Sequence, residues 1–465
     1  MAECKFNKVL VANRGEIAIR VFRACYDLGL HTVAMYSNED TFSLFRTKAD
    51  EAYLIGENKS PLGAYLDIPS IIDLARRRNV DAIHPGYGFL SENADFARAC
   101  EEAGITFIGP SSTILAQMGD KLTAKAIAHA CGVPTIPGSD RPLKDGEEAL
   151  AKAVEYGFPI ILKAAGGGGG RGMRRCDTPE EVIPAFDLVK SEAKKAFGNE
   201  DIFIEKYLVE PKHIEVQILG DKHGNVVHLF ERDCSLQRRY QKVVEFAPAF
   251  SVPETTRQKL YEDAVKVARH VGYVSAGTVE FLVDKSGNHY FIEMNPRIQV
   301  EHPVTELVTG LDLVREQIRV SAGLPLSVTQ EEVLFRGHAI ECRINAEDPA
   351  KGFQPCPGRI DFLHLPGGYG VRVDTGLYTG YELPPYYDSL MAKLIVYAPT
   401  RLEAIRRMRR ALEELVIEGP ATNTDLLHQI LHHPDFVRGN YSTGFLEAHM
   451  DTLLAWSGSG EVREV

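Results

Sequence analysis

The sequence predicts a multidomain protein of mixed α/β and α+β class, and three observations support this prediction. The first region alternates short apolar runs with stretches of helical periodicity, which is typical of a parallel sheet with helices on its faces. The middle and last regions contain mostly strand-like runs with few helices between them. The chain has 465 residues, more than one hydrophobic core usually supports, so several domains are expected.

Composition excludes several classes of protein. Hydrophobic residues make up 44% and charged residues 25% of the chain, which excludes disordered and fibrous proteins. The formal net charge of −12 argues against nucleic-acid binding, so an anionic substrate must be received by a local positive patch. The eight cysteines show no CxxC pair or zinc-ligand spacing, and no run approaches the roughly 20 apolar residues of a membrane span. The N-terminus lacks the apolar core of a signal peptide, and we expect a cytoplasmic protein that contacts neither membrane nor nucleic acid.

The pattern of apolar runs in roughly the first 115 residues predicts a Rossmann-type unit. The strand Val9–Ala12 leads into a turn at Gly15 and then a helix, and further strand runs follow at 32–36, 82–84 and 107–109. One turn glycine is weak evidence for a nucleotide, so we interpret this unit as a scaffold.

A glycine loop follows the next strand. The segment Phe158–Met173 reads FPIILKAAGGGGGRGM, in which an apolar strand ends at Lys163 and five glycines, 166–170, precede Arg171. Glycine permits positive φ and close approach, so the backbone amides can surround an anionic oxygen. A flexible linker would be flanked by polar and proline-rich sequence instead. Because the spacing is neither the dinucleotide fingerprint nor the P-loop, another phosphate-binding nucleotide fold is indicated.

The glycine loop belongs to a small α+β unit. A connector rich in Pro and Gly at 132–146 precedes helix 146–155, and helix 179–196 and strand 202–205 follow the loop. We expect this unit to be a lid over bound nucleotide, hinged near Pro134 and Lys206.

Two carboxylates are expected to meet in the hairpin Gly277–Met294. If a four-residue loop follows Asp284, then Asp284 faces His289 and Glu280 lies opposite Glu293. Opposed carboxylates destabilise a sheet unless a cation neutralises them, and two carboxylates with nucleotide phosphates are a usual Mg²⁺ arrangement. The alternative is that both carboxylates are solvated on an exposed face. The segment that follows Glu293 makes this alternative less favoured.

From Glu293 onward, polar and apolar residues alternate. The strand period of two then directs one set of side chains into a single cleft, although Pro296 must bend the chain. An amphipathic edge strand would alternate in the same way, but it would not predict the paired Glu280. The polar set is Glu293, Asn295, Arg297, Gln299 and Glu301.

Two further segments complete the pattern. The stretch Glu231–Lys242 carries four cationic side chains, which we interpret as a positive wall for phosphate or carbonate, with a solvated basic loop as the alternative. The last region predicts a strand at 337–341 and a helix over Arg401–Ile417, ended by Gly419-Pro420. Lys393 follows Met-Ala and superficially suggests a biotin-attachment site, but the apolar run after it indicates a packed strand.

Along nearly its whole length, from Lys8 to about Met450, the chain resembles biotin carboxylase, the ATP-grasp component of biotin-dependent carboxylases. Single motifs are moderately specific, but their ordered set is very specific. The motifs are VANRGEIAIR at Val11–Arg20, HPGYGFLSEN at His84–Asn93, MGDK at Met118–Lys121, the glycine loop, EKYL at Glu205–Leu208, RDCSLQRRYQKVVE at Arg232–Glu245, EMNPRIQVEHPVTE at Glu293–Glu306, ECRINAEDP at Glu341–Pro349 and PPYYDSL at Pro384–Leu390.

The resemblance implies an ATP-grasp fold with an N-terminal Rossmann-like domain and a C-terminal biotin carboxylase domain. The implied boundaries are 1–115 for the N-terminal domain, 116–335 for the ATP-grasp domain with its lid at about 134–206, 336–450 for the C-terminal domain and 451–465 for a tail.

The resemblance also implies the nucleotide and metal sites. Lys121 and Lys163 would contact ATP phosphates, and Gly169 and Gly170 would sit in the lid loop. The adenine hinge would be Glu205, Lys206, Tyr207 and Leu208, and the pocket would be completed by His213 and Gln237. The implied ligands of Mg²⁺ or Mn²⁺ are Glu280, Glu293 and Asn295.

By the same resemblance, bicarbonate would be held by Lys242, Arg297, Gln299 and the backbone of Val300. Glu301 would be the base that deprotonates bicarbonate, and Arg343 would face the ureido oxygen of biotin. Tyr87 and Gly88 would line the biotin entrance. Many bacterial members carry His where this chain has Tyr240, so no role is transferred to Tyr240.

The implied reaction is the first half-reaction of an acetyl-CoA or pyruvate carboxylase. ATP and bicarbonate would form carboxyphosphate, and its carboxyl group would end on N1 of biotin. The implied partners are a biotin carboxyl carrier protein or domain, a carboxyltransferase subunit and a second copy of the chain. Two alternatives stay open: another bicarbonate-activating ATP-grasp ligase, similar to carbamoyl-phosphate synthetase, and a non-catalytic nucleotide-binding regulatory subunit.

Overall fold

A five-stranded, all-parallel sheet forms the N-terminal unit in the computed structural model of the protein, which describes residues 5–164, 172–197 and 199–457. The strand order is β3-β2-β1-β4-β5, and helices cover both faces. The strands are β1 (Lys8–Val11), β2 (His31–Tyr36), β3 (Glu51–Leu54), β4 (Ala82–His84) and β5 (Thr106–Phe107). The helices around them are α1 (Gly15–Asp27), α2 (Pro61–Tyr65), α3 (Ile68–Arg77) and α4 (Ala94–Glu102), with 3₁₀ turns at Asn38–Asp40 and Leu44–Lys48.

Strand β1 shows why this sheet is apolar on both faces. Val9 and Val11 pack into a core that includes α1, whereas Leu10 and Ala12 pack into a second core with α3 and α4. A strand buried on both faces reads as a continuous apolar run, which is the signal that predicted it.

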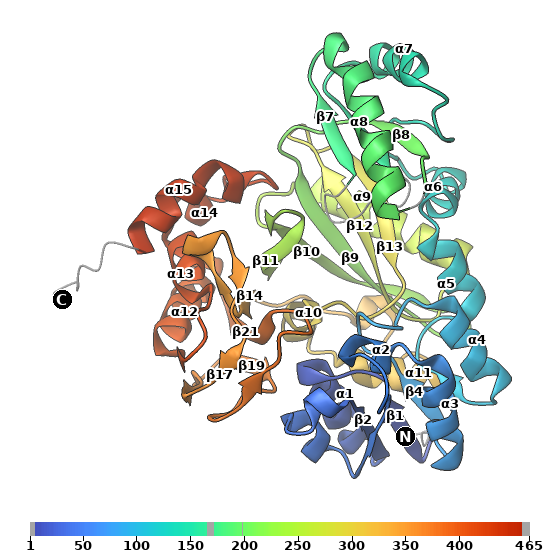
Figure 1. Cartoon of the computed structure of the whole chain (residues 1–465), viewed down its shortest axis with the longest axis vertical. Coiled ribbons are helices and arrows are strands. Elements are labelled where there is room, and N and C mark those ends of the chain that lie inside the picture. Colours follow the sequence, from blue (N-terminus) through green and yellow to red (C-terminus); the bar gives the residue numbers. More distant parts are fainter. Residues whose placement is uncertain (1–4, 165–171, 198, 458–465) are drawn as a thin grey trace.

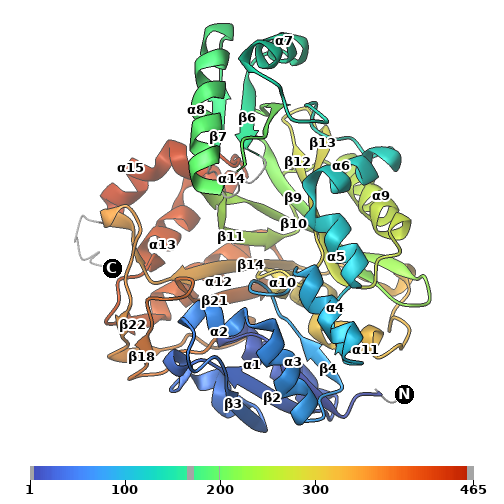
Figure 2. The ribbon, with the colours of Figure 1, turned by 45° about the vertical axis from the view of Figure 1, so that its right-hand side comes forward.

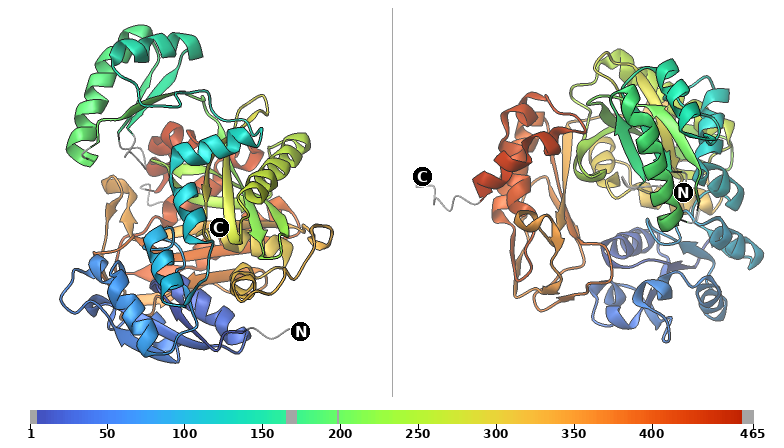
Figure 3. Two further views of the ribbon diagram at one scale, coloured as in Figure 1. Left: turned by 90° about the vertical axis from the view of Figure 1, so that its right-hand side faces the viewer. Right: turned by 45° about the horizontal axis from the view of Figure 1, so that its top comes forward.

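A small separate unit projects from the rest of the molecule, at the top of Figure 1. Its antiparallel sheet has the order β7-β6-β8 and is covered by two helices with which it shares its own hydrophobic core. Figure 3 shows in its left panel that helices α5 and α6 lead toward this unit along the side of the molecule. The elements are α5 (Ser112–Gly119), α6 (Lys121–Ala130), α7 (Gly146–Tyr156), β6 (Ile160–Ala164), β7 (Met173–Cys176), α8 (Pro179–Phe197) and β8 (Ile202–Lys206).

An eight-stranded antiparallel sheet forms the centre of the molecule, in the order β13-β12-β9-β10-β11-β14-β21-β19. It runs without interruption across the predicted boundary at residue 335, because β11 pairs with β14. Figure 2 shows β10, β11 and β14 side by side above the N-terminal unit. The strands are β9 (Lys212–Gly220), β10 (Val226–Arg238), β11 (Gln241–Ala247), β12 (Ser275–Val283), β13 (His289–Asn295), β14 (His338–Asn345), β19 (Val371–Thr375) and β21 (Leu390–Ala398).

Helices cover both faces of this sheet. One face packs against α9 (Glu254–His270) at the β9–β12 end and against α12 (Arg401–Glu414) and α13 (Thr424–His432) at the β14–β21 end. The other face packs against α10 (His302–Thr309), through Val304 and Val308. The remaining helices are α11 (Leu313–Ser321), α14 (Pro434–Arg438) and α15 (Phe445–Ser457), with 3₁₀ turns at Gln330–Glu332 and Pro349–Lys351.

Short strands complete the last region and correct one prediction. The helix predicted over 401–417 ends at Glu414, because Val416–Glu418 forms β22 and pairs with β18 (Phe362–His364). β-Branched Val416 and Ile417 suit a strand better than a helix end. The other short strands are β15 (Glu347–Asp348), β16 (Gln354–Pro355), β17 (Gly358–Arg359) and β20 (Glu382–Leu383). Among the described helices, we find none with the length and apolarity required to traverse a bilayer.

Candidate active site

A row of charged side chains crosses the eight-stranded sheet on the face that α10 covers. The strand register places Glu280 opposite both Glu293 and Glu215, and Glu215 opposite Arg232. Farther along the sheet, Glu245 lies opposite Glu341, and Arg343 lies opposite Lys393. Most of these side chains are buried, so the row must be internally paired to be stable.

The structure forms the predicted Glu280–Glu293 pair by a different route. Near the turn, Val283 rather than Asp284 lies opposite His289, so the loop is one residue longer than expected. A bulge in β13 then shifts the register by one residue and brings Glu280 opposite Glu293. The two carboxylates therefore share one face, as the sequence predicts.

Lys242 lies at the centre of the site and contacts three carboxylates. Its Nζ is 2.5 Å from Glu215 Oε2, 3.0 Å from Glu280 Oε1 and 2.7 Å from Glu301 Oε1. Burial would lower the pKa of Lys242, but the three carboxylates outweigh burial and raise this pKa well above its ordinary value. Lys242 is therefore a fixed positive charge.

Glu301 is fully buried and is held between two cations. Lys242 contacts Oε1, and Arg343 Nη2 donates to Oε2 at 2.9 Å. Burial would raise the pKa of Glu301, but Lys242, Arg343 and Arg232 outweigh it and hold this pKa well below its ordinary value. The carboxylate is ionised, and in this arrangement it is a weak base.

Arg343 links Glu301 to a second buried carboxylate. Its Nε donates to Glu245 Oε1 at 2.5 Å. Burial raises the pKa of Glu245 to about 7, against the opposing effect of Arg343, and burial also raises the pKa of Glu341 well above its usual range. The Arg343 guanidinium is thus held in one orientation by Glu245 and Glu301.

The segment after β13 carries a chain of side-chain hydrogen bonds. Arg297 Nη1 donates to Gln299 Oε1 at 2.8 Å, and Arg297 Nη2 donates to Asn295 Oδ1 at 3.2 Å. Gln299 Nε2 donates to Glu280 Oε1 at 3.0 Å. The strand ends at Asn295, where Pro296 bends the chain, as the alternation with Pro296 predicted. Gln299 therefore contacts Glu280 and Glu301 contacts Lys242, whereas Arg297 is linked to Glu280 through Gln299 and Asn295 and also pairs with Glu92 at 3.3 Å.

His213 and Gln237 lie at the opposite side of Glu280. Gln237 Nε2 is 2.9 Å from His213 Nδ1 and donates to the carbonyl of Cys234 at 2.8 Å. His213 Nε2 is 2.8 Å from Glu280 Oε2. The Glu280 carboxylate is therefore contacted from both sides.

A donor set suited to a hard cation lies at the β12–β13 hairpin. Glu280, Glu293 and Asn295 offer only oxygen ligands, which Mg²⁺ and Mn²⁺ prefer. Burial, followed by the Glu280 charge, raises the pKa of Glu293, against the opposing effect of Lys121. A divalent cation between Glu280 and Glu293 would offset their mutual repulsion, so the residues present fit the metal that the sequence predicts.

The predicted nucleotide residues lie where the small unit joins the central sheet. Glu205 contacts Lys163 and, at 3.4 Å, Lys125. Burial would raise the pKa of Glu205, but the two lysines outweigh it and lower this pKa. Lys121 lies exposed in the first turn of α6, which begins at the cap Asp120, and its charge acts on Glu293.

Lys206, near which the lid is predicted to hinge, and the adjacent Tyr207 are held by hydrogen bonds to backbone carbonyls. Lys206 Nζ donates to the carbonyls of Gly157 and Phe158 at 2.8 Å each, and Tyr207 N donates to the carbonyl of Pro159. Leu208 follows, half-buried. The Lys206 side chain is thereby held within the fold, and its backbone N–H donates to the carbonyl of Pro137 at 2.8 Å. Gly169 and Gly170 lie outside the described residues.

Tyr87 and Gly88 follow β4 in the N-terminal unit. The Tyr87 hydroxyl donates to Glu16 Oε1, and Asn13 Nδ2 donates to the Tyr87 carbonyl at 2.8 Å. Gly88 has φ of +68°, a conformation that disfavours other residues. This turn faces the C-terminal unit through Glu16, which lies 3.1 Å from Lys393 Nζ.

The basic stretch 231–242 is not a positive wall. It forms the end of β10, a tight turn and the start of β11, so its cations point in different directions. Arg232 is buried against Glu215, Arg238 stacks on Phe353, and only Lys242 of these three joins the Glu280–Glu301 cluster.

The sequence did not predict that four residues of the site would lie there: Glu16, Glu215, Glu245 and Lys393. Each lies in a strand or helix that reads as ordinary scaffold, and each is buried. A charged residue inside an otherwise apolar run, such as Lys393 in Leu390–Ala398, was the available signal, because charged residues are rarely buried without a partner.

Three sequence models of protein families match the chain. They are described as biotin carboxylase N-terminal domain over residues 5–115, carbamoyl-phosphate synthase L chain ATP-binding domain over 120–329, and biotin carboxylase C-terminal domain over 341–448.

Curated relatives are similar over nearly the whole chain. The 2-oxoglutarate carboxylase small subunit of Hydrogenobacter thermophilus is 54% identical over 444 residues, 96% of this chain and 94% of that protein. The biotin carboxylase of a Nostoc species is 53% identical and is 99% covered. The chain spans only 38% of human mitochondrial pyruvate carboxylase, to which it is also 53% identical.

Solved structures are equally similar. The biotin carboxylase domain dimer of the Hydrogenobacter thermophilus 2-oxoglutarate carboxylase, in complex with MgADP, ADP and bicarbonate, has a TM-score of 0.92 and 54% identity. The coverage is 96% of this chain and 98% of that one. A biotin carboxylase–beta-gamma-ATP complex from Campylobacter jejuni has a TM-score of 0.92 at 46% identity, with 96% of this chain and 99% of that chain covered.

Proposed function

The chain belongs to the biotin carboxylase family and is an ATP-dependent carboxylase, and from that premise we propose that it carboxylates N1 of biotin carried on a separate protein or domain. The observation that carries this proposal is the Lys242–Glu301–Arg343 cluster, which is linked to Arg297 through Glu280 and Gln299. It places a carboxylate between two cations, next to a guanidinium and an amide that can hold a small anion.

Bicarbonate would bind between Arg297 and Lys242, with Gln299 and the backbone of Val300 as further partners. A planar guanidinium suits two oxygens of a planar anion, and the partner bonds of Arg297 within its own segment fix its orientation. Holding bicarbonate in line with the terminal phosphate of ATP supplies much of the rate enhancement by orientation.

Glu301 would accept the proton of bicarbonate. With Lys242 and Arg343 both in contact, its pKa is too low for an effective base. An arriving bicarbonate competes for Lys242, and the loss of that contact raises the basicity of Glu301 at the moment when a base is needed. The site thus couples base strength to substrate binding.

The nucleotide would lie between the small unit and the central sheet. We assign Lys121, Lys163, Gly169 and Gly170 to the phosphates, with the adenine held by residues 205–208 and the pocket completed by His213 and Gln237. Glu280, Glu293 and Asn295 would hold Mg²⁺ or Mn²⁺, which when bound neutralises phosphate charge. Lys163 must exchange Glu205 for phosphate as the nucleotide arrives.

Biotin would bind on the Arg343 side of Glu301. Arg343, oriented by Glu245, can stabilise negative charge on the ureido oxygen while N1 loses its proton to phosphate released from carboxyphosphate. Tyr87 and Gly88 would line the approach. Closing the site would keep water from carboxyphosphate.

Partners follow from the chemistry. Lys393 is fully buried, so it is not a biotin attachment site, and we propose that biotin arrives on a carrier protein or domain. A carboxyltransferase would then use the carboxylated carrier. A homodimer is proposed because a similar biotin carboxylase domain has been solved as a dimer.

The test is ADP release by the purified chain. We expect release to require bicarbonate and Mg²⁺ and to increase when free biotin is added. Because one matching family is named for carbamoyl-phosphate synthase, ammonia is added in a parallel reaction. Ammonia-dependent ADP release without biotin stimulation would contradict the proposal and favour that second activity.

A further inference from the structure

Lys393 is a buried cation that the proposed mechanism does not use. It lies on β21, and its side chain is wholly inaccessible to solvent. Its Nζ donates to the carbonyl of Val300 at 3.1 Å, lies 3.1 Å from Glu16 Oε1 and lies 3.8 Å from Asp374 Oδ2. Burying an ammonium group is unfavourable unless it is paired and hydrogen-bonded, so these contacts fix its position.

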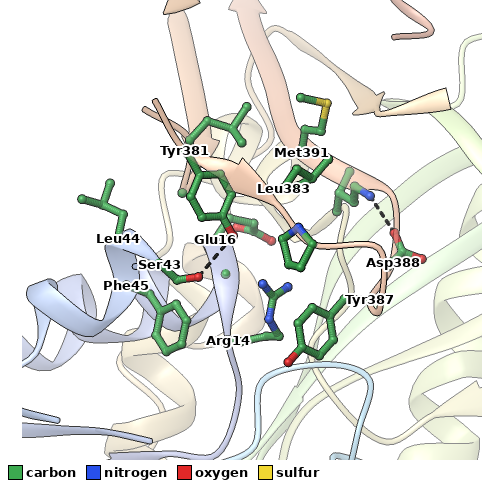
Figure 4. A pocket seen from close by; sticks show the side chains of 15 residues that line it. Arg14, Glu16, Ser43, Leu44, Phe45, Tyr381, Leu383, Tyr387, Asp388 and Met391 are labelled. Atoms are coloured by element: carbon green, nitrogen blue, oxygen red, sulfur yellow. Dashed lines mark hydrogen bonds between the residues drawn. The ribbon is translucent and has the colours of Figure 1, made fainter. Parts of the chain in front are cut away.

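The contacts of Lys393 join three parts of the chain. Val300 stands in the segment that carries Arg297, Gln299 and Glu301. Glu16 belongs to the N-terminal unit, and its Oε1 also accepts the hydroxyl of Tyr87. Figure 4 shows Glu16 where the two units meet, with Arg14 and Ser43 on one side and Tyr381 and Met391 on the other.

A continuous path therefore runs from the Tyr87 hydroxyl through Glu16 and Lys393 to the Val300 carbonyl. Glu16, Asp374 and Glu341 together outweigh the effect of burial and raise the pKa of Lys393, so it keeps its charge over the working pH range. The path links the proposed biotin side to the proposed bicarbonate segment and does not pass through the nucleotide residues.

Resting on the proposed function, we propose that Lys393 is a positioning residue that fixes the bicarbonate-binding segment, through the Val300 carbonyl, relative to Tyr87. The carboxyl group must pass from the Arg297 side of Glu301 to biotin on the Arg343 side. A displacement of about 1 Å between reacting groups lowers rates on the order of 100-fold, so the relative position of these two sides matters.

The experiment compares Lys393→Met with Lys222→Met. Lys222 is the control, because it is an exposed lysine that also donates to a backbone carbonyl, that of Ser321, at 2.8 Å and lies outside the site. We expect Lys393→Met to raise the KM for bicarbonate at least about tenfold and to lower the biotin-dependent kcat about 100-fold. The KM for MgATP should stay within about threefold of wild type, because the nucleotide residues lie on other elements.

Glu16→Gln gives a second measurement, since it keeps a hydrogen-bond acceptor for Tyr87 but removes the charge that pairs with Lys393. It should raise the KM for bicarbonate in the same direction, and the effect of the double variant should be smaller than the product of the single effects. A folded Lys393→Met chain with the wild-type KM for bicarbonate would overturn the inference. If Lys393→Met does not fold, an unchanged KM in Glu16→Gln would do so.

Parallel increases in the KM values for MgATP and bicarbonate would also overturn the inference, because they indicate general disruption. The wild-type chain separates this inference from the proposed function. If the wild type shows no bicarbonate- and biotin-dependent ADP release, the proposed function fails, whatever the variants do.

Discussion

Glu301 shows how neighbouring residues set the chemistry of a single side chain. Its carboxylate accepts from Lys242 and Arg343, and both cations have other carboxylate partners, Glu215 and Glu245. Removing the Glu301 charge therefore leaves neither cation unpaired, so a substitution there tests chemistry with limited effect on folding.

We predict that Glu301→Gln lowers bicarbonate-dependent ATP cleavage at least about 100-fold while ATP binding is retained, because glutamine cannot accept the proton. Arg297→Ala should have a similar effect, because it removes the guanidinium that holds the anion. Steady-state ADP release and nucleotide binding by calorimetry measure the two properties. Arg98→Ala, at an exposed ion pair on α4, serves as the control. Wild-type turnover in Arg297→Ala would remove bicarbonate from this segment.

Glu280 gives a second prediction for a single residue. Its carboxylate contacts Lys242, Asn295 and Gln299, and it lies opposite Glu293. Glu280→Gln should raise the free Mg²⁺ concentration needed for half-maximal activity about 10- to 100-fold, because one anionic oxygen ligand is lost. Activity titrated against Mg²⁺ at fixed ATP measures this. Glu262→Gln, on the exposed side of α9, is the control. An unchanged Mg²⁺ dependence would exclude Glu280 from the metal site.

At the scale of elements, the β12–β13 hairpin shows the limit of counting residues. Counting outward from the expected four-residue loop placed Glu280 opposite Glu293, and the structure has that pair although its loop is longer. The bulge that restores the pairing after a longer turn has no simple signal in the sequence, since it arises from how the two strands twist together. In the same way, the β10–β11 hairpin separates the cations of the expected basic wall, since Arg232 is buried and Lys242 is half-buried among carboxylates.

Strand β10 also carries a pH-dependent element. His228 stacks on Tyr261 with ring centroids 4.3 Å apart, and burial lowers its pKa to about 4. The unfolded chain takes up a proton at this position below about pH 6.5, whereas the folded chain does not. This histidine therefore contributes stability above pH 6.5 that is lost as pH falls toward 4.

We predict that His228→Phe reduces the acid sensitivity of folding. Between pH 7.5 and 5.5 the wild type should lose about 1 kcal/mol more unfolding free energy than the variant, since only the wild type binds the extra proton on unfolding. Urea unfolding at both pH values gives the difference, in which any pH-independent cost of the substitution cancels. Equal losses in both proteins would show that folding does not lower the pKa of His228.

At the scale of the whole molecule, Glu306 joins the three parts of the chain. On α10, it accepts from Arg20 of the N-terminal unit at 2.6 Å and from Arg372 of the C-terminal unit at 2.8 Å. Burial would raise its pKa, but the two arginines outweigh burial and lower it. The carboxylate is therefore a charged junction between units.

We predict that Glu306→Gln lowers the free energy of unfolding by about 1–3 kcal/mol, because it removes one buried charged partner of Arg20 and of Arg372, which keep Asp312 and Asp374 as their other partners. Urea unfolding followed by circular dichroism measures this. Asp73→Asn, which breaks an exposed ion pair with Arg77 on α3, should change stability little. Equal stability of the Glu306→Gln and wild-type chains would mean that the units dock independently of this contact.

The sequence by itself determined the parallel N-terminal sheet, the small unit around the glycine loop and the polar residues proposed for the site. It could do so because hydrophobic periodicity is local, and because motifs such as EMNPRIQVEHPVTE keep several polar residues within one short segment.

Only the tertiary structure decided which charges meet. Glu16, Glu245 and Lys393 are far from Val300 and Glu301 in the sequence, and they reach the site because one sheet continues from β13 to β19 against the N-terminal unit. Pairing between buried charges depends on strand register and domain docking, which are non-local. No local pattern of residues contains that information.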